Sequence, residues 1–247
     1  MNHDWIVPDW PAPANVKALI TTRSGGVSAG PRATLNLGYK AGDDPAAVAQ
    51  NRARVETLLP QPPRWLAQTH GTRVVDADTL TGTPEADASV AHNAGTVCTI
   101  MIADCLPVLF TNRSGTRVAA AHAGWRGLSG GVIANTVQAL MDAGDEPADL
   151  LAYIGPGIGP AAFEVGTDVH EAFTARDAQT AAAFVAHAPG KWLADLFTLA
   201  RYALRRAGLA PAQIFGGGLC TYSDPQRFYS YRRDKTTGRM AAFIWRQ

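Results

Sequence analysis

Two short apolar runs with five residues between them constrain the fold of this chain more than any other feature. The runs are Val97–Ile102 and Val108–Phe110, and Cys105 lies between them. Apolar runs of this length, bounded by turn residues, are typical of buried strands. The sequence therefore predicts two buried strands joined by a tight turn that carries a cysteine.

A histidine stands at the end of each neighbouring apolar run. His70 follows Arg64–Thr69, and His122 follows Arg117–Ala121. Both runs are predicted strands, so His70, Cys105 and His122 would lie at three strand ends that one sheet can bring to a common edge. One thiolate and two imidazoles leave the fourth position of a tetrahedral zinc ion open, which is the arrangement of a catalytic zinc site.

The same residues support a second interpretation. Cys105 would be a nucleophile, His122 or His70 its base, and Asp104 the group that orients the base. Spacing does not separate the two interpretations, because both require a thiolate with histidine partners. A second histidine is explained better by a metal than by a base, which favours the metal site.

Composition and charge narrow the class of protein. The 247 residues carry 22 Lys+Arg against 21 Asp+Glu, which gives no general affinity for nucleic acid or an anionic membrane. The sequence shows neither a signal peptide nor a run of about 18 apolar residues that would span a membrane. Three cysteines without a CxxC motif fit a reducing compartment, so a cytoplasmic protein is expected.

Strands and helices are predicted to alternate without a repeat or a linker. We expect a mixed α/β fold, with a mixed β-sheet flanked by helices, in a single domain over residues 1–247 after an N-terminal tail of about 1–14. Further strands are predicted at 16–22, 72–76, 150–154, 213–215 and 239–245, and helices at 45–59, 132–141, 167–174, 178–186 and 191–207. Residues 76–94 are predicted to form a long surface connection holding at most one short strand.

Glycine-bearing segments offer further candidate sites. The loop at 23–31 begins with Arg23, and Arg126 lies at the predicted helix N-terminus after His122, a place that suits an anion. Both segments can equally be tight connections, and the sequence leaves this open. The run at 155–160 resembles a dinucleotide fingerprint only superficially, because its prolines remove N–H groups that a pyrophosphate needs.

Several motifs together resemble one known family. They are Thr22–Ser28, Leu35–Gly38, Gln68–Gly71, Ala103–Pro107, His122–Gly127, Ile154–Pro156 with Phe163–Val165, and Phe228–Arg233. The chain is similar over Lys17 to Trp245 to the YfiH-type family. Its members are described as polyphenol oxidase or laccase-domain proteins, and also as purine nucleoside phosphorylases.

The resemblance implies a zinc site at His70, Cys105 and His122. It implies phosphorolysis of purine nucleosides such as adenosine, inosine and methylthioadenosine, together with deamination of adenosine. We expect a monomer or a small homo-oligomer. Editing of peptidoglycan precursors is attributed to some relatives, and an amidase-like Cys/His hydrolase is the related alternative. Copper-dependent oxidation of phenols is disfavoured, because a laccase needs many histidines and this chain has six, with no His-x-His pair.

Seven residues are candidates for contacts with the substrate. Phosphate or ribose would be held by Arg23, Arg126, Arg232 and Arg233, and orientation would come from Asn36, Gln68 and Asp104. Each can equally be a structural residue. Cys98 and Cys220 are interpreted as bystander thiols, but a fourth protein ligand such as Cys220 would indicate a structural zinc in a binding or scaffold protein.

Overall fold

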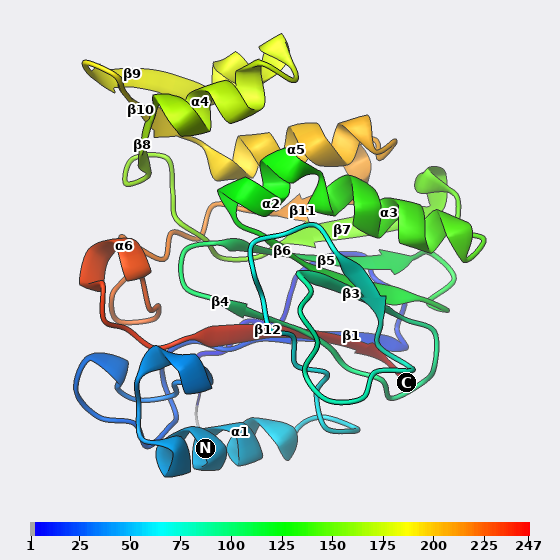
Figure 1. Ribbon diagram of the computed structural model, residues 1–247. Coiled ribbons are helices and arrows are strands. Elements are labelled where there is room, and N and C mark those ends of the chain that lie inside the picture. Colours follow the sequence, from blue (N-terminus) through cyan, green and yellow to red (C-terminus); the bar gives the residue numbers. More distant parts are fainter. Residues whose placement is uncertain (1–2) are drawn as a thin grey trace.

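Two β-sheets are stacked at the centre of the structure, a computed structural model that describes residues 3–247 (Figure 1). The larger sheet is mixed and has the order β11 (Ile214–Gly216), β7 (Leu150–Ile154), β5 (Leu106–Asn112), β6 (Val118–Ala123), β3 (Ala88–Ala91), β2 (Val74–Asp76). The smaller sheet is antiparallel and has the order β1 (Val16–Ile20), β12 (Met240–Arg246), β4 (Cys98–Ile102).

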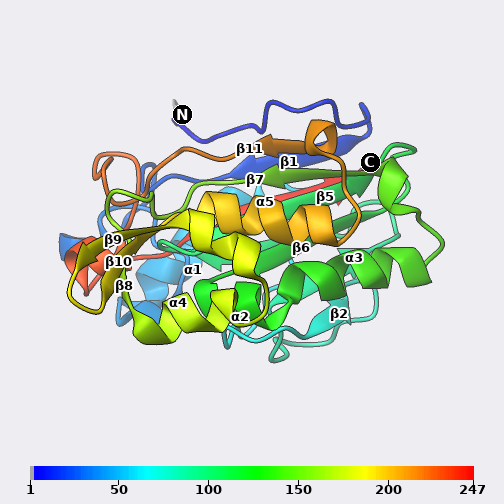
Figure 2. The ribbon, with the colours of Figure 1, turned by 90° about the horizontal axis from the view of Figure 1, so that it is seen from above.

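Helices cover the outer faces of this pair of sheets (Figures 1 and 2). The helix α1 (Pro45–Glu56) lies against the smaller sheet, and the larger sheet is covered by α2 (Trp125–Gly130), α3 (Val132–Asp142) and α5 (Leu196–Arg206). Above them lie α4 (Thr167–Thr174) and a third sheet, in the order β8 (Glu164–Gly166), β10 (Lys191–Ala194), β9 (Phe184–Ala188). The short helix α6 (Tyr231–Asp234) precedes β12.

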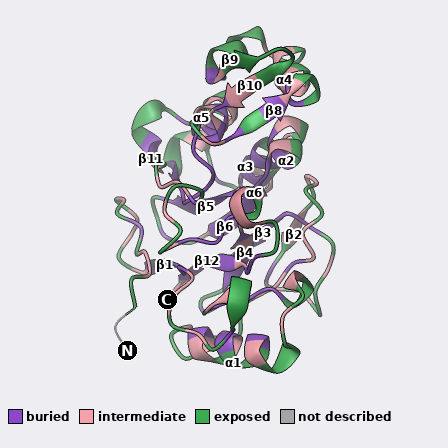
Figure 3. Ribbon diagram, turned by 90° about the vertical axis from the view of Figure 1, so that its left-hand side faces the viewer, coloured by how far each residue is buried: buried purple, intermediate pink, exposed green. Residues whose placement is uncertain are grey.

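The two-residue period of the strands explains why the layers stack. Alternate residues of β12 enter different cores, because successive side chains of a strand point to opposite faces. The core between the sheets receives Met240, Ala242 and Ile244, and the core beneath α1 receives Ala241, Phe243 and Trp245. Figure 3 shows the buried residues gathered in these central strands, whereas β9 is exposed.

The strand β6 follows the same rule, and this positions one candidate ligand. Ala119, Ala121 and Ala123 belong to the core under the helices, whereas Val118 and Ala120 face the smaller sheet. His122, the second-to-last residue of β6, therefore points to the same side as Val118 and Ala120, toward the smaller sheet that contains β4.

The predicted mixed α/β fold class is confirmed, and several elements lie where the sequence placed them. The helix α1 starts at Pro45, after Asp44 caps it by accepting a hydrogen bond from the Ala46 N–H at 2.9 Å. Cys105 occupies the short connection between β4 and β5, as predicted. Of the predicted tail, Ile6 forms a bridge with Ile20, whereas Met1 and Asn2 lie outside the described residues.

The strand predicted at 64–69 is wrong. This segment makes only isolated bridges, at Arg64 with Cys98 and at Ala67 with Glu85. The Gln68 side chain takes the place of further backbone pairing, because its amide bonds both the N–H and the carbonyl of Met101, at 2.8 Å each. His70 consequently lies in a loop, with a φ of 61°, and not at a strand end.

The helices predicted at 191–207 and 178–186 are each split. Asp195 caps α5 by accepting a hydrogen bond from the Thr198 N–H at 3.0 Å, so the helix starts at Leu196 and the preceding residues form β10. Residues 178–183 form a 3-10 helix, and β9 follows it.

The prediction that 76–94 holds at most one short strand is confirmed, because β3 is the one strand that begins within it, but the expected surface location is wrong for this strand. All four residues of β3 are buried, and this strand lies between β2 and β6 in the larger sheet. Its side chains, two alanines, a serine and a valine, are small, fit between neighbouring layers and gave little apolar signal in the sequence.

Candidate active site

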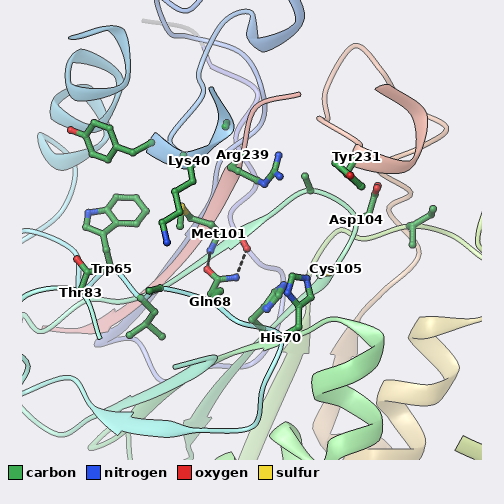
Figure 4. Close-up of a pocket in the computed structure, with 18 of the residues that line it drawn as sticks. Lys40, Trp65, Gln68, His70, Thr83, Met101, Asp104, Cys105, Tyr231 and Arg239 are labelled. Carbon is green, nitrogen blue, oxygen red and sulfur yellow. Dashed lines mark hydrogen bonds between the residues drawn. The ribbon is translucent and has the colours of Figure 1, made fainter. Parts of the chain in front are cut away.

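A cavity of about 690 Å³ opens at one end of the two stacked sheets (Figure 4). Segments distant in the sequence line it, including the 3-10 helix Tyr39–Ala41, the stretch after β4, the end of β6, and α6. Its volume lies in the range of about 300–1,000 Å³ that is typical of small-molecule sites. The cavity is therefore large enough for a nucleoside-sized molecule.

His70, Cys105 and His122 meet on the wall of this cavity. Their donor atoms all lie within 4.8 Å of one another, and the two imidazole rings meet edge to face with centroids 4.8 Å apart. Among residues 3–247 they are the one group of three or more potential ligands that could hold a metal ion. One sulfur and two nitrogen donors suit zinc and leave a fourth position open.

Asp87 holds two of these residues in place. Its Oδ1 lies 2.8 Å from His122 Nδ1 and accepts a hydrogen bond from the His70 N–H at 2.9 Å. Its Oδ2 accepts hydrogen bonds from the Gly71 and Thr69 N–H groups and from the Thr69 hydroxyl. A carboxylate on Nδ1 fixes the tautomer of His122 and leaves Nε2 as the donor for a metal.

Gly124 provides the space in which the cluster closes. A Cβ at this position would lie 2.8 Å from the Cys105 Sγ and 3.0 Å from the His70 Cδ2. Both distances are shorter than ordinary van der Waals contact. The cluster thus depends on a glycine directly after β6, and this geometry fits a small ion held between the three side chains.

The neighbouring histidines favour the thiolate form of Cys105, which is the form that binds a metal. Burial opposes ionisation of Cys105, but the charges and hydrogen bonds of His122 and His70 lower the pKa of its thiol below the ordinary value. Burial also lowers the pKa of His122, yet the Cys105 thiolate and Asp87 together raise it. For Asp87, hydrogen bonds from His122 and from backbone N–H groups outweigh burial and lower its pKa to about 2. The site therefore stabilises a thiolate and a carboxylate, and it favours a cation between them.

Three of the seven predicted substrate-contact residues line the cavity, namely Gln68, Asp104 and Arg232. Asp104 is nearly buried, has a φ of 93°, and accepts hydrogen bonds from the Thr221 hydroxyl and the Arg232 N–H at 2.7 Å each. Arg232 donates to the Glu164 carbonyl and lies over the Phe163 ring. These contacts anchor α6 at the edge of the cavity.

The other four lie outside the cavity lining. Arg23 donates to two backbone carbonyls and stacks on Tyr229, Arg233 donates to the carbonyls of three residues and to Asp234, and Arg126 is exposed beside Trp125. Asn36 is buried and bonds Gly38, Asp43 and the Arg239 N–H. Its contact with Arg239 links it to the site indirectly.

Sequence reasoning missed several residues of the site. Asp87 was placed in a surface loop, and the lining residues Arg52, Trp65 and Arg239 received no role. Asp87 stands directly before Ala88–Ala91, and recognising that segment as a strand would have indicated a carboxylate at a strand end.

The remaining cysteines are separate from the cluster. Cys98 is fully buried, and burial raises the pKa of its thiol to about 12. Cys220 accepts hydrogen bonds from the Gly159 N–H and from Ser223, away from the cavity. Within the described chain, no fourth protein ligand joins His70, Cys105 and His122.

Comparison with known proteins identifies the family. A family model described as "Multi-copper polyphenol oxidoreductase laccase" matches residues 17–247. Two curated relatives, both named purine nucleoside phosphorylase, are each 54% identical: one from Pseudomonas aeruginosa over 98% of both chains, and YfiH from Escherichia coli over 97% of this chain and 98% of that one. The crystal structure of protein NMB0706 from Neisseria meningitidis shares 51% identity and a TM-score of 0.95 over 99% of both chains.

The chain belongs to the YfiH-type family, as its motifs indicated. The family model covers His70, Cys105 and His122 and every residue that lines the cavity. As for the membrane, every helix within residues 3–247 is too short or too polar to cross a bilayer.

Proposed function

We propose that this chain is a zinc-dependent purine nucleoside phosphorylase. It would convert adenosine, inosine or methylthioadenosine and inorganic phosphate into the free base and the corresponding 1-phosphorylated sugar. The observation that carries this proposal is an open three-donor cluster, on the wall of a cavity of about 690 Å³, in a chain 54% identical to proteins named purine nucleoside phosphorylase.

His70, Cys105 and His122 would hold the zinc ion, which when bound supplies a Lewis-acidic charge and one open coordination position. Asp87 keeps His122 in the ligand tautomer and fixes the backbone of His70. Asp104 holds α6 against the cavity through the Arg232 N–H. The protein therefore contributes a cluster whose parts are positioned before substrate binds.

Phosphorolysis breaks the bond between ribose C1′ and the base and forms a bond from C1′ to a phosphate oxygen. The base leaves with the electron pair and takes up a proton, and the phosphate becomes the sugar ester. Most of this task is positional and electrostatic, because the phosphate must be held beside C1′. The cavity suits an anionic co-substrate, since Lys40, Arg52, Arg232 and Arg239 line it and the carboxylate among its lining residues is Asp104.

Deamination of adenosine is the second activity that we assign to the same cavity. Water would replace the amino group at C6 of the purine, with release of ammonia and without phosphate. It requires an activated water next to the base, which the open three-donor cluster suits. Inosine formation from adenosine in phosphate-free buffer would detect it.

A Cys/His hydrolase is the alternative with a specific observation in its favour. Asp87, His122 and Cys105 follow one another, because Asp87 lies 2.8 Å from His122 Nδ1 and the donor atoms of His122 and Cys105 lie within 4.8 Å of each other. In a cysteine hydrolase the same arrangement would make Cys105 the nucleophile, His122 its base and Asp87 the group that orients the base. This form would act on amide-bearing substrates such as peptidoglycan precursors, and zinc would inhibit it by occupying the thiolate.

Oxidation of phenols by several coppers is disfavoured by the donor set. Four-electron reduction of oxygen by a laccase requires several copper ions and therefore several sets of ligands. Residues 3–247 provide one group of three potential ligands. A purely structural zinc is disfavoured because Cys220, the candidate fourth ligand, lies elsewhere.

The proposal is tested with purified protein of known zinc content. Inosine and adenosine are incubated with and without phosphate, and the products are separated by chromatography. Free base is expected only with phosphate, and it is expected to disappear after zinc removal and in Cys105→Ala. Cys220→Ala is the matched control and should retain both zinc and activity. Base release by the zinc-free protein would overturn the zinc-dependent reading.

A further inference from the structure

Two of the arginines in the cavity wall lack a carboxylate partner. Arg52 and Arg239 are partly buried, and within residues 3–247 neither guanidinium lies at ion-pair distance from an acidic side chain. Burial lowers the pKa of Arg52 to about 10 and also lowers that of Arg239. A desolvated charge without a partner destabilises the fold, so its presence in a cavity points to a partner that arrives with the ligand.

The contacts of Arg52 hold its guanidinium flat against the wall. It lies over the rings of Trp65, at 3.7 Å, and Tyr39, at 4.5 Å, while Nε donates to the Leu37 carbonyl at 2.9 Å. The Trp65 ring also meets the edge of Phe243. Because Arg52 covers one face of Trp65 and Phe243 packs against the same ring, this tryptophan is poorly placed to stack on a purine. The wall instead presents the edge of a guanidinium.

Hydrogen bonds to neighbouring residues hold both the backbone and the side chain of Arg239. Its N–H donates to Asn36 Oδ1 at 2.8 Å, and Nη1 donates to the carbonyls of Thr237 and Gly238. A Cβ on Gly38 would lie 2.8 Å from the Arg239 Cγ, so the side chain passes over a position that only glycine leaves open. Residues 36–38 thus support both arginines, because Leu37 bonds Arg52 and its neighbours contact Arg239.

Both guanidinium groups keep unused donors. Within the described chain, Arg52 Nη1 and Arg239 Nε and Nη2 make no hydrogen bond to protein. Each of these nitrogens also keeps some accessible surface. They are therefore accessible from the cavity. Arg232 differs, since it donates to the Glu164 carbonyl and its N–H is held by Asp104.

We propose that Arg239 and Arg52 form a phosphate subsite in this cavity. Arginine presents planar forks of N–H donors that match phosphate oxygens, and two unpaired cations match a phosphate dianion. Inorganic phosphate, the co-substrate, is one source of this group, and that reading rests on the proposed function. The 5′-phosphate of a nucleotide is the other source of the same chemistry. Asn36 and Gly38 are positioning residues for the subsite.

The test is calorimetric titration of inorganic phosphate into the zinc-loaded protein, run for wild type, Arg239→Gln and Arg52→Gln. Arg113→Gln is the matched control, because Arg113 is exposed and lies outside the cavity lining. The loss of a charge-assisted hydrogen bond corresponds to a dissociation constant about tenfold to a hundredfold higher. We expect this for Arg239→Gln and a smaller increase for Arg52→Gln, with Arg113→Gln like wild type.

Two further variants separate binding from folding. Gly38→Ala keeps both charges but displaces the Arg239 side chain, so phosphate affinity should fall while the thermal midpoint falls little. Arg239→Lys keeps the charge without the fork and should bind phosphate between wild type and Arg239→Gln. In the steady state, KM for phosphate should rise in Arg239→Gln while KM for inosine stays within about twofold, consistent with loss of a phosphate contact alone.

Each outcome decides one claim. If both glutamine variants bind phosphate and inosine 5′-monophosphate as wild type does, the subsite is refuted, even where wild type releases base with phosphate. If wild type binds phosphate through these arginines but releases no base, the proposed function fails and the subsite stands. If inosine 5′-monophosphate binds in an arginine-dependent way and inorganic phosphate does not, the subsite serves the phosphate of a nucleotide.

Discussion

Replacing Asp87 by asparagine is predicted to weaken metal binding by changing the tautomer of His122. The Asp87 Oδ2 accepts three hydrogen bonds, from Thr69 and Gly71, so the single oxygen of an asparagine would remain there. Its amide nitrogen would then face the His70 N–H and donate to His122 Nδ1. A donor on Nδ1 moves the ring hydrogen to Nε2, the nitrogen that would bind the metal.

The size of both effects follows from these contacts. One charge-assisted hydrogen bond, from the His70 N–H, is lost, which corresponds to about 2 kcal/mol of unfolding free energy. For a chain of this length that lowers the thermal midpoint by about 4–8 °C. Loss of the partner that orients a histidine ligand typically lowers metal affinity by about 10–100-fold.

The assay is zinc competition against a chromogenic chelator, together with thermal unfolding of the metal-free protein. Asp78→Asn is the matched control, because the Asp78 carboxylate also accepts backbone N–H bonds, from His92 and Asn93, but lies outside the cavity lining. Asp78→Asn should lose stability and keep its zinc affinity. A zinc affinity in Asp87→Asn within twofold of wild type would refute the reasoning.

Three other predictions test the surroundings of the cluster. Gly124→Ala should lose zinc affinity at least tenfold, because its Cβ meets Cys105, whereas Gly82→Ala, with open space around its Cβ, should only lose about 1 kcal/mol of stability; equal zinc affinity in both would contradict this. In zinc-free protein at pH 7, iodoacetamide should modify Cys105 quickly and Cys98 not at all, as judged by peptide mass spectrometry; adding zinc should protect Cys105. Asn51→Ala should cost about 3 kcal/mol in denaturant unfolding, because this buried amide donates to three groups of the 28–36 segment, and unchanged stability would refute that role.

The central cluster was predictable because its signals are local. Cys105 lies between two apolar runs that do form β4 and β5, and His122 ends a run that forms β6. The motifs indicated the YfiH-type family, and the match of the family model to residues 17–247 confirms that membership. His70 was identified as a candidate ligand because it follows a run predicted to be a strand, and it reaches the cluster although that run forms only isolated bridges.

Other parts of the site depend on contacts that no local pattern reveals. Arg52 lies on α1 and Arg239 directly before β12, 187 positions later in the chain. Residues 36–38 contact both of them, because Leu37 accepts a hydrogen bond from Arg52 while Asn36 and Gly38 contact Arg239. A single arginine in a sequence is more often a surface residue, so the pair emerges only from the folded structure.

Element boundaries failed where a polar side chain replaced backbone pairing or capped a helix. Gln68 bonds Met101 in place of a strand, and Asp195 starts a helix where the apolar stripe alone suggested an earlier beginning. The buried position of β3 in the larger sheet was not predicted, because alanine and serine carry a weak strand signal. In each case a tertiary contact overrides the local propensity.

Phosphorus NMR of a reaction containing inosine, inorganic phosphate and the zinc-loaded protein tests the central claim most directly. The account predicts that inorganic phosphate is consumed and a ribose 1-phosphate resonance grows, in equal amount to the hypoxanthine released, and that Cys105→Ala shows neither change. Hypoxanthine that accumulates with free ribose while the phosphate signal stays constant would contradict phosphorolysis. Inosine that stays intact with fully zinc-loaded protein, as judged by proton NMR of the same sample, would contradict the nucleoside assignment itself.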